Sequence, residues 1–310
     1  MTSDLATEHH DELRPLMFSI AYRMLGSVAD AEDVVQEAFL RLHRAPAVDV
    51  RSVSSYAATV TTRLAIDQLR SARVRRERYV GSWLPEPLLT TGPEADPAVH
   101  AERADSLSLA FLVVLETLSP VERAVFLLRE VFGYDYAEIG DIVEKSAVNC
   151  RQIFTRAHRR IAAGEPRFEA SRERRDDLAR AFFAACESGD IDELEQILAE
   201  DVVFHGDGGG KAPAIPKPVQ GRVQVARFLL GIVRQVAAFN GRIEPTVVNG
   251  QPGGRLVDGE GRLASVFELQ IADGQVHALR NVLNPDKLGH LGPLVDPASL
   301  PGAGRRTRDR

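Results

Sequence analysis

The chain has 310 residues and a formal net charge of −6, with 44% hydrophobic and 26% charged residues. This composition is typical of a globular protein of two or three domains and excludes disordered, fibrous and disulfide-framework proteins. With Cys150 and Cys186 as its two cysteines, the sequence favours a reduced, cytoplasmic compartment and predicts no metal site. The N-terminal segment has no signal-peptide core and no apolar run reaches the ~20 residues of a membrane span, so we expect no membrane partner.

Positive charge is concentrated in two short stretches of this acidic chain. Residues 63–80 contain six arginines against two acidic residues, and residues 145–160 contain one lysine and four arginines without an acidic residue. A local basic field is the usual footprint of nucleic-acid binding. The net charge of the whole chain therefore does not exclude DNA as a partner.

The first helical pattern is amphipathic. Apolar residues recur every three or four positions over residues 31–42, Gly26 can end the preceding helix, and Ser27 with Asp30 resembles a capping box. Another helical pattern starts at Val53 and runs into the first basic stretch. The polar face of the 31–42 helix is either a solvated surface or an acidic docking surface for a partner; it consists of Asp30, Asp33, Gln36, Glu37 and Arg41.

Residues 81–105 contain four prolines, which predicts an extended linker. Its WLPEPLL stretch is too apolar for a solvated tether, and we expect it to dock on another part of the protein.

Three helix-start signals follow a helical pattern over residues 107–118. They are Ser119-Pro120-Val121-Glu122, Asp135-Tyr136-Ala137-Glu138 after Gly133, and Ser146-Ala147-Val148-Asn149. Two short helices and a tight turn before a basic helix predict a helix-turn-helix. We expect the inner face of the last helix to hold Ala147, Cys150, Phe154, Ala157 and Ile161. Its outer face can contact bases and phosphates through Ser146, Asn149, Arg151, Gln152, Arg156 and Arg159.

After residue 164 the pattern becomes mixed. We expect helices near residues 178–186, 191–198 and 224–236, a strand at 202–205, and a hairpin of strands 263–271 and 275–284 joined by Asp273-Gly274. The Gly-, Pro- and Arg-rich residues 291–310 predict a flexible tail.

Two motifs then carry a family resemblance. SVADAEDVVQEAFLRLHR, followed by SYAATVTTRLAIDQLRSARVRRE, resembles the second conserved region of sigma-70-family initiation factors, and LSPVERAVFLLREVFGYDYAEIGDIVEKSAVNCRQIFTRAHRRI resembles their fourth region. The short linker between them is the architecture of the extracytoplasmic-function (ECF) group, and the resemblance covers about residues 5–163. It implies that the 30–41 face docks on the β′ subunit of RNA polymerase, with core β and β′ as partners, and that the last helix reads the promoter −35 element.

The first basic stretch suits the capture of an opened −10 element, because a displaced strand needs cations along its backbone. The candidate residues are Arg63, Arg70, Arg73, Arg75 and Arg76. Stacking aromatic residues are sparse, namely Tyr56, Tyr79 and Trp83. Arg70 also has a structural alternative, a buried intrahelical pair with Asp67.

Residues 174–290 resemble the SnoaL-like fold, a cone shared with nuclear transport factor 2. WLPEP (83–87), DGGGK (207–211) and NPDKL (284–288) together resemble the SigJ-type branch of ECF factors, which carries this extension. The resemblance implies regulatory interdomain contacts by Trp83, Leu84, Pro85, Asp207, Lys211, Asn284, Pro285, Asp286 and Lys287.

Three functions remain open for the cone. His205, Asp207, Lys211 and His277 offer acid–base chemistry, although Asp207-Gly-Gly-Gly also fits a tight turn in which Lys211 simply caps or pairs with Asp207. The cone can instead hold an unidentified small ligand. A regulatory docking module without catalysis or cofactor is the interpretation we favour.

The sequence therefore predicts two all-α helical domains followed by an α+β SnoaL-like cone. The expected boundaries are residues 1–80 for region 2, 81–105 for the linker, 106–163 for region 4, 174–290 for the cone and 291–310 for the tail. The favoured function is a monomeric RNA polymerase sigma factor that is not an enzyme and is regulated by its fused domain. The competing class is an enzyme or ligand sensor with a helical DNA-binding domain, such as a one-component repressor, which leaves the acidic 30–41 face unexplained.

Overall fold

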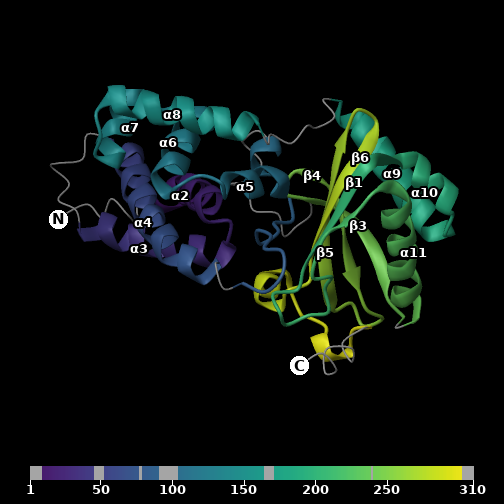
Figure 1. Cartoon of the computed structure of the whole chain (residues 1–310). Coiled ribbons are helices and arrows are strands. Elements are labelled where there is room, and N and C mark those ends of the chain that lie inside the picture. The colour runs from purple at the N-terminus through teal and green to yellow at the C-terminus, as the bar shows by residue number, and fades with distance from the viewer. Residues whose placement is uncertain are drawn as a thin grey trace. The chain divides into compact units, whose positions relative to one another are not determined.

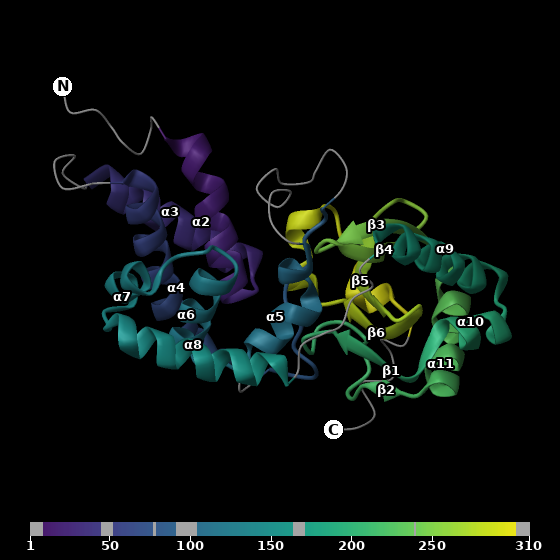
Figure 2. The ribbon, with the colours of Figure 1, turned by 90° about the horizontal axis from the view of Figure 1, so that it is seen from above.

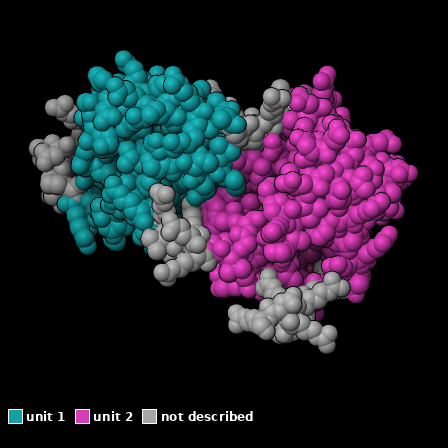
Figure 3. All heavy atoms as spheres, viewed as in Figure 1, with its two compact units in different colours: residues 1–77, 96–107, 111–165 teal, residues 78–95, 108–110, 166–310 magenta. Residues whose placement is uncertain are grey.

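The computed structural model describes residues 9–44, 52–76, 79–90, 104–163, 171–238 and 240–301. Its contacts divide the chain into two compact units (Figure 3): unit 1 comprises residues 1–77, 96–107 and 111–165, and unit 2 comprises residues 78–95, 108–110 and 166–310. Both helical regions of the sequence thus belong to unit 1, whereas the WLPEP segment belongs to unit 2 with the cone.

Three helices form the first half of unit 1: α2 (His10–Leu25), α3 (Val28–Arg44) and α4 (Val53–Arg76), which pack on one another (Figure 1). Gly26 ends α2 as predicted, with φ at 65° and its N–H donated to the Tyr22 carbonyl. Ser27 Oγ accepts from the Asp30 N–H at 3.1 Å, which begins α3. The predicted apolar stripe of α3 is buried at Ala31, Val34, Val35, Ala38 and Leu42.

The second half of unit 1 comprises η3 (Ala104–Leu107), α5 (Leu109–Leu115) except for its first two residues, which belong to unit 2, α6 (Pro120–Glu130), α7 (Tyr136–Val143) and α8 (Ala147–Ala162). The three predicted start signals are confirmed: Ser119 and Asp135 form capping boxes with Glu122 and Glu138, and Ser146 caps α8. Cys150, Ala157 and Ile161 lie on the buried face of α8, but Ala147 is exposed. The prediction for Ala147 was wrong because the first turn of α8 lies beyond the apolar cluster, which Cys150 and Ile153 join.

A buried arginine connects the two halves of unit 1. Arg123 on α6 is 3% exposed, and its guanidinium donates to the Met24 carbonyl at 2.7 Å and to Glu116 Oε1 at 2.8 Å. The Met24 carbonyl lies near the end of α2, where carbonyls have no partner within the helix. One side chain thus donates hydrogen bonds to both a helix-end carbonyl and a carboxylate.

Unit 2 contains a six-stranded sheet of order β2-β1-β6-β5-β4-β3. Its strands are β1 (Leu198–Asp207), β2 (Val219–Gln220), β3 (Arg242–Val248), β4 (Gln251–Val257), β5 (Leu263–Ala272) and β6 (Gln275–Val282). β1 and β6 are parallel, and the other neighbours are antiparallel. Helices α9 (Arg172–Ser188), α10 (Ile191–Ile197) and α11 (Arg222–Ala238) lie on one face of the sheet (Figures 1 and 2). The core between these layers includes Phe182, Leu194, Phe204 and Leu269.

Two hairpins turn on residues with positive φ. Asp273 and Gly274 have φ at 49° and 71°, which confirms the predicted turn between β5 and β6. Asn249 and Gly250 have φ at 52° and 76° and join β3 to β4. The sequence analysis did not resolve this second hairpin, although Asn-Gly is an equally strong turn signal.

The predicted flexible tail is wrong for residues 291–301. Val295 and Leu300 are 6% and 8% exposed and join a cluster with Val236 and Leu256. The Leu263 N–H donates to the Pro293 carbonyl at 2.8 Å, and the Val295 N–H donates to the Leu263 carbonyl at 3.0 Å. Burial of two apolar side chains thus orders a stretch whose Gly and Pro content indicated a tail. Residues 302–310 lie outside the described part of the chain.

Arg123→Ala is expected to lower the free energy of unfolding by about 2–4 kcal/mol, because it removes a buried guanidinium that donates to the partly buried Glu116 carboxylate and to the helix-end Met24 carbonyl. Urea unfolding followed by helical circular dichroism measures the change. Arg160→Ala is the control, since Arg160 is half exposed in its pair with Glu122 and its removal should cost less than about 1 kcal/mol. Equal losses for the two variants would contradict the assignment.

Candidate functional site

The outer face of α3 divides into exposed and internal positions. Asp33, Gln36 and Arg41 are exposed, and Arg41 Nε pairs with Glu37 Oε1 at 2.9 Å. Leu40, which the sequence analysis did not single out, is 52% exposed among them. Asp30 is half-buried and accepts a hydrogen bond from Gln68 of α4 at 3.0 Å. The exposed part of this face is therefore Leu40 with charged and polar side chains around it.

Arg63 of α4 is held by the end of α7. Its guanidinium donates to the Ile142 and Asp141 carbonyls at 2.9 and 2.8 Å and lies 3.4 Å from Glu144. A cation at a helix C-terminus is favoured by the unpaired carbonyls and the helix dipole. The Arg63 side chain is nevertheless 45% exposed, so water reaches this contact.

The expected Asp67–Arg70 pair exists at 2.9 Å, but it is exposed and not buried. The two side chains are three residues apart on one face of α4 and are 63% and 71% exposed, so they pair in contact with solvent. Arg73, Arg75 and Arg76 lie in the last turns of α4, and their side chains are outside the described part of the structure.

The outer face of α8 is fully available. Asn149, Arg151, Gln152, Arg156 and Arg159 are all exposed. Ser146 differs in that its Oγ accepts the Asn149 N–H at 3.2 Å, so it serves as the N-cap of the helix. The Arg151 guanidinium lies 5.2 Å from the centre of the Tyr136 ring, which orients it by a cation–π contact. Val148, missed in the sequence, is 67% exposed in the first turn of the helix.

In unit 2 the WLPEP segment is bound by a buried carboxylate. Asp207 at the end of β1 has no exposed surface, and its Oδ2 accepts the Leu84 N–H at 2.8 Å and the Lys287 ammonium at 2.7 Å. Its Oδ1 accepts the Tyr79 hydroxyl at 2.5 Å and the Gly209 N–H at 3.0 Å. Burial and the Asp207 carboxylate both raise the pKa of Tyr79, which therefore stays a neutral donor.

The Lys287 ammonium is enclosed from several sides. It donates to the Leu84 carbonyl at 2.5 Å, and it lies 4.6 Å from the Tyr79 ring centre and 4.5 Å from that of Trp83. The Lys287 side chain is 8% exposed. An ammonium in such a site is stabilised by the carboxylate and by the two aromatic faces together.

NPDKL and DGGGK meet at this carboxylate. Asn284 donates its side-chain amide to the Tyr79 hydroxyl at 2.8 Å, and Pro285 starts a short 3₁₀ turn that presents Lys287. Gly209 has φ at 56°, and a Cβ there would lie 2.2 Å from the Asn284 amide nitrogen, so glycine is required. Lys211 pairs with Asp286 at 2.5 Å and not with Asp207, because the Asp207 oxygens are already occupied.

Further anchors extend along the linker segment, and no sequence pattern indicated which residues would form them. Buried Asn249 accepts the Leu88 N–H at 2.8 Å and donates its own N–H to the Leu88 carbonyl. The Thr90 N–H donates to the Val247 carbonyl at 3.0 Å, and His290 Nε2 lies 2.9 Å from the Pro87 carbonyl. Residues 84–90 are buried throughout.

Glu268 is a second buried carboxylate of the sheet. It accepts the Leu109 N–H at 2.6 Å and lies 3.4 Å from the Ala110 nitrogen, at the start of α5. Burial raises the pKa of Glu268 to about 7, against the opposing effect of Arg280 and of these two N–H groups. In the sequence, one glutamate within a strand pattern looks like an exposed position, so this role of Glu268 was not predicted.

The four residues considered for acid–base chemistry are not brought together as one group. Burial, together with the charge of Arg280, lowers the pKa of His205 to about 4, so His205 is neutral. His277 lies 3.9 Å from exposed Asp201, while Asp207 and Lys211 belong to the contacts above. Among the described residues, no group of three or more His, Cys, Asp or Glu side chains is placed to hold a metal ion. No helix in the described ranges is both long and apolar enough to cross a membrane.

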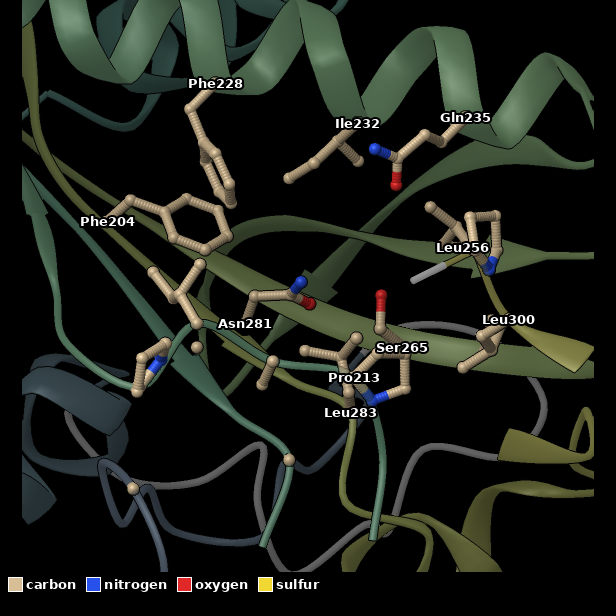
Figure 4. Close-up of a pocket in the computed structure, with 18 of the residues that line it drawn as sticks. Phe204, Pro213, Phe228, Ile232, Gln235, Leu256, Ser265, Asn281, Leu283 and Leu300 are labelled. Carbon is tan, nitrogen blue, oxygen red and sulfur yellow. The ribbon is translucent and has the colours of Figure 1, made fainter. Parts of the chain in front are cut away.

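A large cavity lies between α11 and the sheet of unit 2 (Figure 4). Its volume is about 1270 Å³, and its walls include Phe204, Phe228, Ile232, Leu256, Leu283 and Leu300. Ser265 and Asn281 of the sheet and Gln235 of α11 supply polar groups to this mostly apolar space.

Comparison with known proteins identifies the parts of the chain. Residues 10–75 match the sigma-70 region 2 family, residues 108–161 match sigma-70 region 4, and residues 179–282 match the SnoaL-like domain. The ECF RNA polymerase sigma factor SigJ of Mycobacterium tuberculosis is 36% identical over 308 residues, which cover 96% of this chain and 98% of that protein. The sigma factor SigG of the same organism is 28% identical over 326 residues, covering 96% and 82%.

A solved structure agrees with this relationship. The crystal structure of the M. tuberculosis ECF sigma factor SigJ matches with a TM-score of 0.74 at 33% identity, over 93% of this chain and 100% of that one. The chain therefore belongs to the ECF sigma factors of RNA polymerase, with a SnoaL-like domain fused to its C-terminus.

Proposed function

We propose that this sigma factor acts as a cytoplasmic monomer that docks on core polymerase through α3 and on promoter DNA through α4 and α8. The observation that supports this most is that one chain presents both an exposed α3 face and an exposed basic α8 face. A one-component repressor needs the second of these surfaces but has no use for the first.

The α3 face is proposed to bind the β′ subunit of the core, with β as a further contact of the whole factor. Leu40 supplies apolar area at the centre, while Asp33, Gln36 and Arg41 supply polar groups around it. Protein interfaces commonly have an apolar centre and a polar rim, and the rim charges steer encounter and select the partner. Asp30 supports the face from within through its bond to Gln68.

The α8 face is proposed to read the −35 element in the major groove. Asn149, Arg151 and Gln152 lie in its first two turns, where side chains of a recognition helix reach base edges. Arg156 and Arg159 follow one and two turns later, where phosphates are the nearer partners. Ser146 contributes through the helix cap that fixes the position of Asn149.

The α4 face is proposed to bind the displaced strand of the −10 element through Arg63, Arg70, Arg73, Arg75 and Arg76. Arg63 must first leave the α7 carbonyls. Exposed contacts of this kind are worth less than about 1 kcal/mol, so phosphates can replace them. Strand capture and separation of α4 from α7 would then occur together.

The fused domain is proposed to regulate transcription by fixing the linker, without catalysis or cofactor. The anchored residues 79–90 lie in the sequence between region 2 and region 4, so anchoring shortens the free chain that joins them. Neutral His205 and hydrogen-bonded Asp207 do not form an acid–base pair with each other, which supports this proposal.

Core polymerase supplemented with this protein should give promoter-dependent run-off transcripts. Asp33→Lys should weaken core binding at least about tenfold, because the lysine would face the positive charge on the partner that Asp33 is proposed to meet. Native gel titration of core measures the affinity, and the run-off assay measures its consequence. Glu187→Lys, an exposed acid of α9 in unit 2, is the charge-matched control. Wild-type protein that is inactive with active core would overturn the proposal.

The free protein should not bind promoter DNA measurably at physiological salt, because its net charge is −6. If α8 neutralises about five phosphates in the holoenzyme, log K falls with log salt at a slope of about −4.5. Arg159→Ala should reduce the slope by about one, whereas Arg174→Ala on α9 should leave it unchanged. Tight, sequence-specific gel shifts by the free protein would contradict this prediction.

Asp207→Asn should release the linker and change transcription, because it leaves the Lys287 ammonium buried without its counter-ion. Trp83 is the single tryptophan of the chain and lies against Lys287, so its emission should shift to longer wavelength and become accessible to acrylamide. Asp286→Asn, which breaks the exposed pair with Lys211, is the matched control and should leave both readouts near wild type. A released Trp83 with unchanged transcription would refute linker anchoring as the regulatory device.

A further inference from the structure

We propose that the cavity of unit 2 binds an uncharged, mainly apolar small molecule that donates a hydrogen bond to Asn281. This inference goes beyond the proposed function, since it assigns a ligand class to a part of the molecule that contacts neither DNA nor polymerase in that proposal.

The cavity has the size and lining of a binding site. At about 1270 Å³ it slightly exceeds the usual range for small-molecule pockets, roughly 300–1,000 Å³. Figure 4 shows Phe204 and Phe228 at one end and Leu256 and Leu300 at the other, with Ile232 above. A largely apolar molecule would bury its surface against these side chains.

Asn281 is the specific polar group in this space. It is 8% exposed, and its Oδ1 accepts no hydrogen bond from any residue in the described ranges. Asn281 pairs with Gly206 on β1 and with Phe267 on β5, so it lies on the face of the sheet that α11 covers. In Figure 4 its amide rises from the sheet into the cavity. A buried acceptor without a donor is unfavourable, and a ligand hydroxyl or N–H would relieve this cost.

The charges around the cavity select a neutral ligand. Among the described residues that line it, Arg227 is the one with a charged side chain, and it is exposed to solvent. An ionised ligand group would enter the apolar interior without a buried counter-charge, which is strongly unfavourable. Ser265, 2% exposed on the same face as Asn281, and Gln235 on α11 can orient a second polar atom of the ligand.

The wall of the cavity also includes the linker. Val80 and Gly81 line it, and they adjoin Tyr79 and Trp83 of the Asp207 contacts. A Cβ on Gly210 would lie 3.3 Å from Val80, so the loop and the linker form one continuous edge. A molecule in the cavity would thus contact the segment that the sheet anchors.

The test uses the full-length chain and two matched fluorescent probes. N-phenyl-1-naphthylamine is neutral, apolar and carries one N–H donor, and its N-methyl derivative lacks that donor. The first should bind once per chain with a Kd on the order of 10 µM, with enhanced emission. The second should bind about three- to tenfold more weakly, because it leaves Asn281 Oδ1 without a donor. Equal affinities would overturn the hydrogen-bond assignment.

Two variants locate the site. Asn281→Leu should remove the difference between the probes, whereas Gly231→Phe should abolish binding of both. Gly231 lies on α11 at the cavity wall, and its Cβ position has no atom within 4 Å, so the larger side chain can enter the cavity without displacing backbone. Val223→Phe, at an exposed position of α11 outside the cavity, is the control. Circular dichroism must match wild type for each variant, and unchanged probe binding in folded Gly231→Phe would refute the site.

Discussion

The buried carboxylate of Asp207 is the constraint on which the linker arrangement depends. A carboxylate with no exposed surface is stable only when its oxygens are fully hydrogen-bonded and its charge is compensated. The sheet alone does not provide this. The donors come from the Lys287 ammonium, the Tyr79 hydroxyl and the N–H groups of Leu84 and Gly209. One desolvated charge at the end of β1 therefore brings the linker, the glycine loop and the segment after β6 to one point.

The composition of the linker makes such acceptors necessary. Pro85 and Pro87 have no N–H, and an extended segment cannot satisfy its remaining backbone groups within itself. The Leu84, Leu88 and Thr90 N–H groups are accepted by Asp207, Asn249 and the Val247 carbonyl, in that order. Glu268 likewise accepts the Leu109 N–H at the start of α5. Unit 2 thus supplies acceptors for N–H groups within residues 84–90 and for that of the first residue of α5.

The features that the sequence predicted best depend on neighbouring residues. The caps at Ser119, Asp135 and Ser146 and the turn at Asp273-Gly274 each involve residues within three positions of one another, and each is confirmed. Contacts between residues far apart in the sequence were harder to predict. One interpretation of the sequence paired Lys211 with Asp207, which is close in sequence, but Lys287, 80 positions away, occupies that carboxylate. Order in the tail likewise depends on Leu263, which no local pattern connects to Val295.

The contacts of Lys287 and Arg63 differ in how easily another partner can replace them. The Lys287 side chain is 8% exposed, and breaking its pair with Asp207 would leave a buried charge without its counter-ion, which costs about 3–5 kcal/mol. Arg63 is 45% exposed at the end of α7, and water or phosphate can replace those carbonyls at little cost. The buried Lys287–Asp207 pair holds the linker segment on the sheet of unit 2, and the exposed Arg63 contact is the one that the proposed binding of the opened strand by α4 would replace.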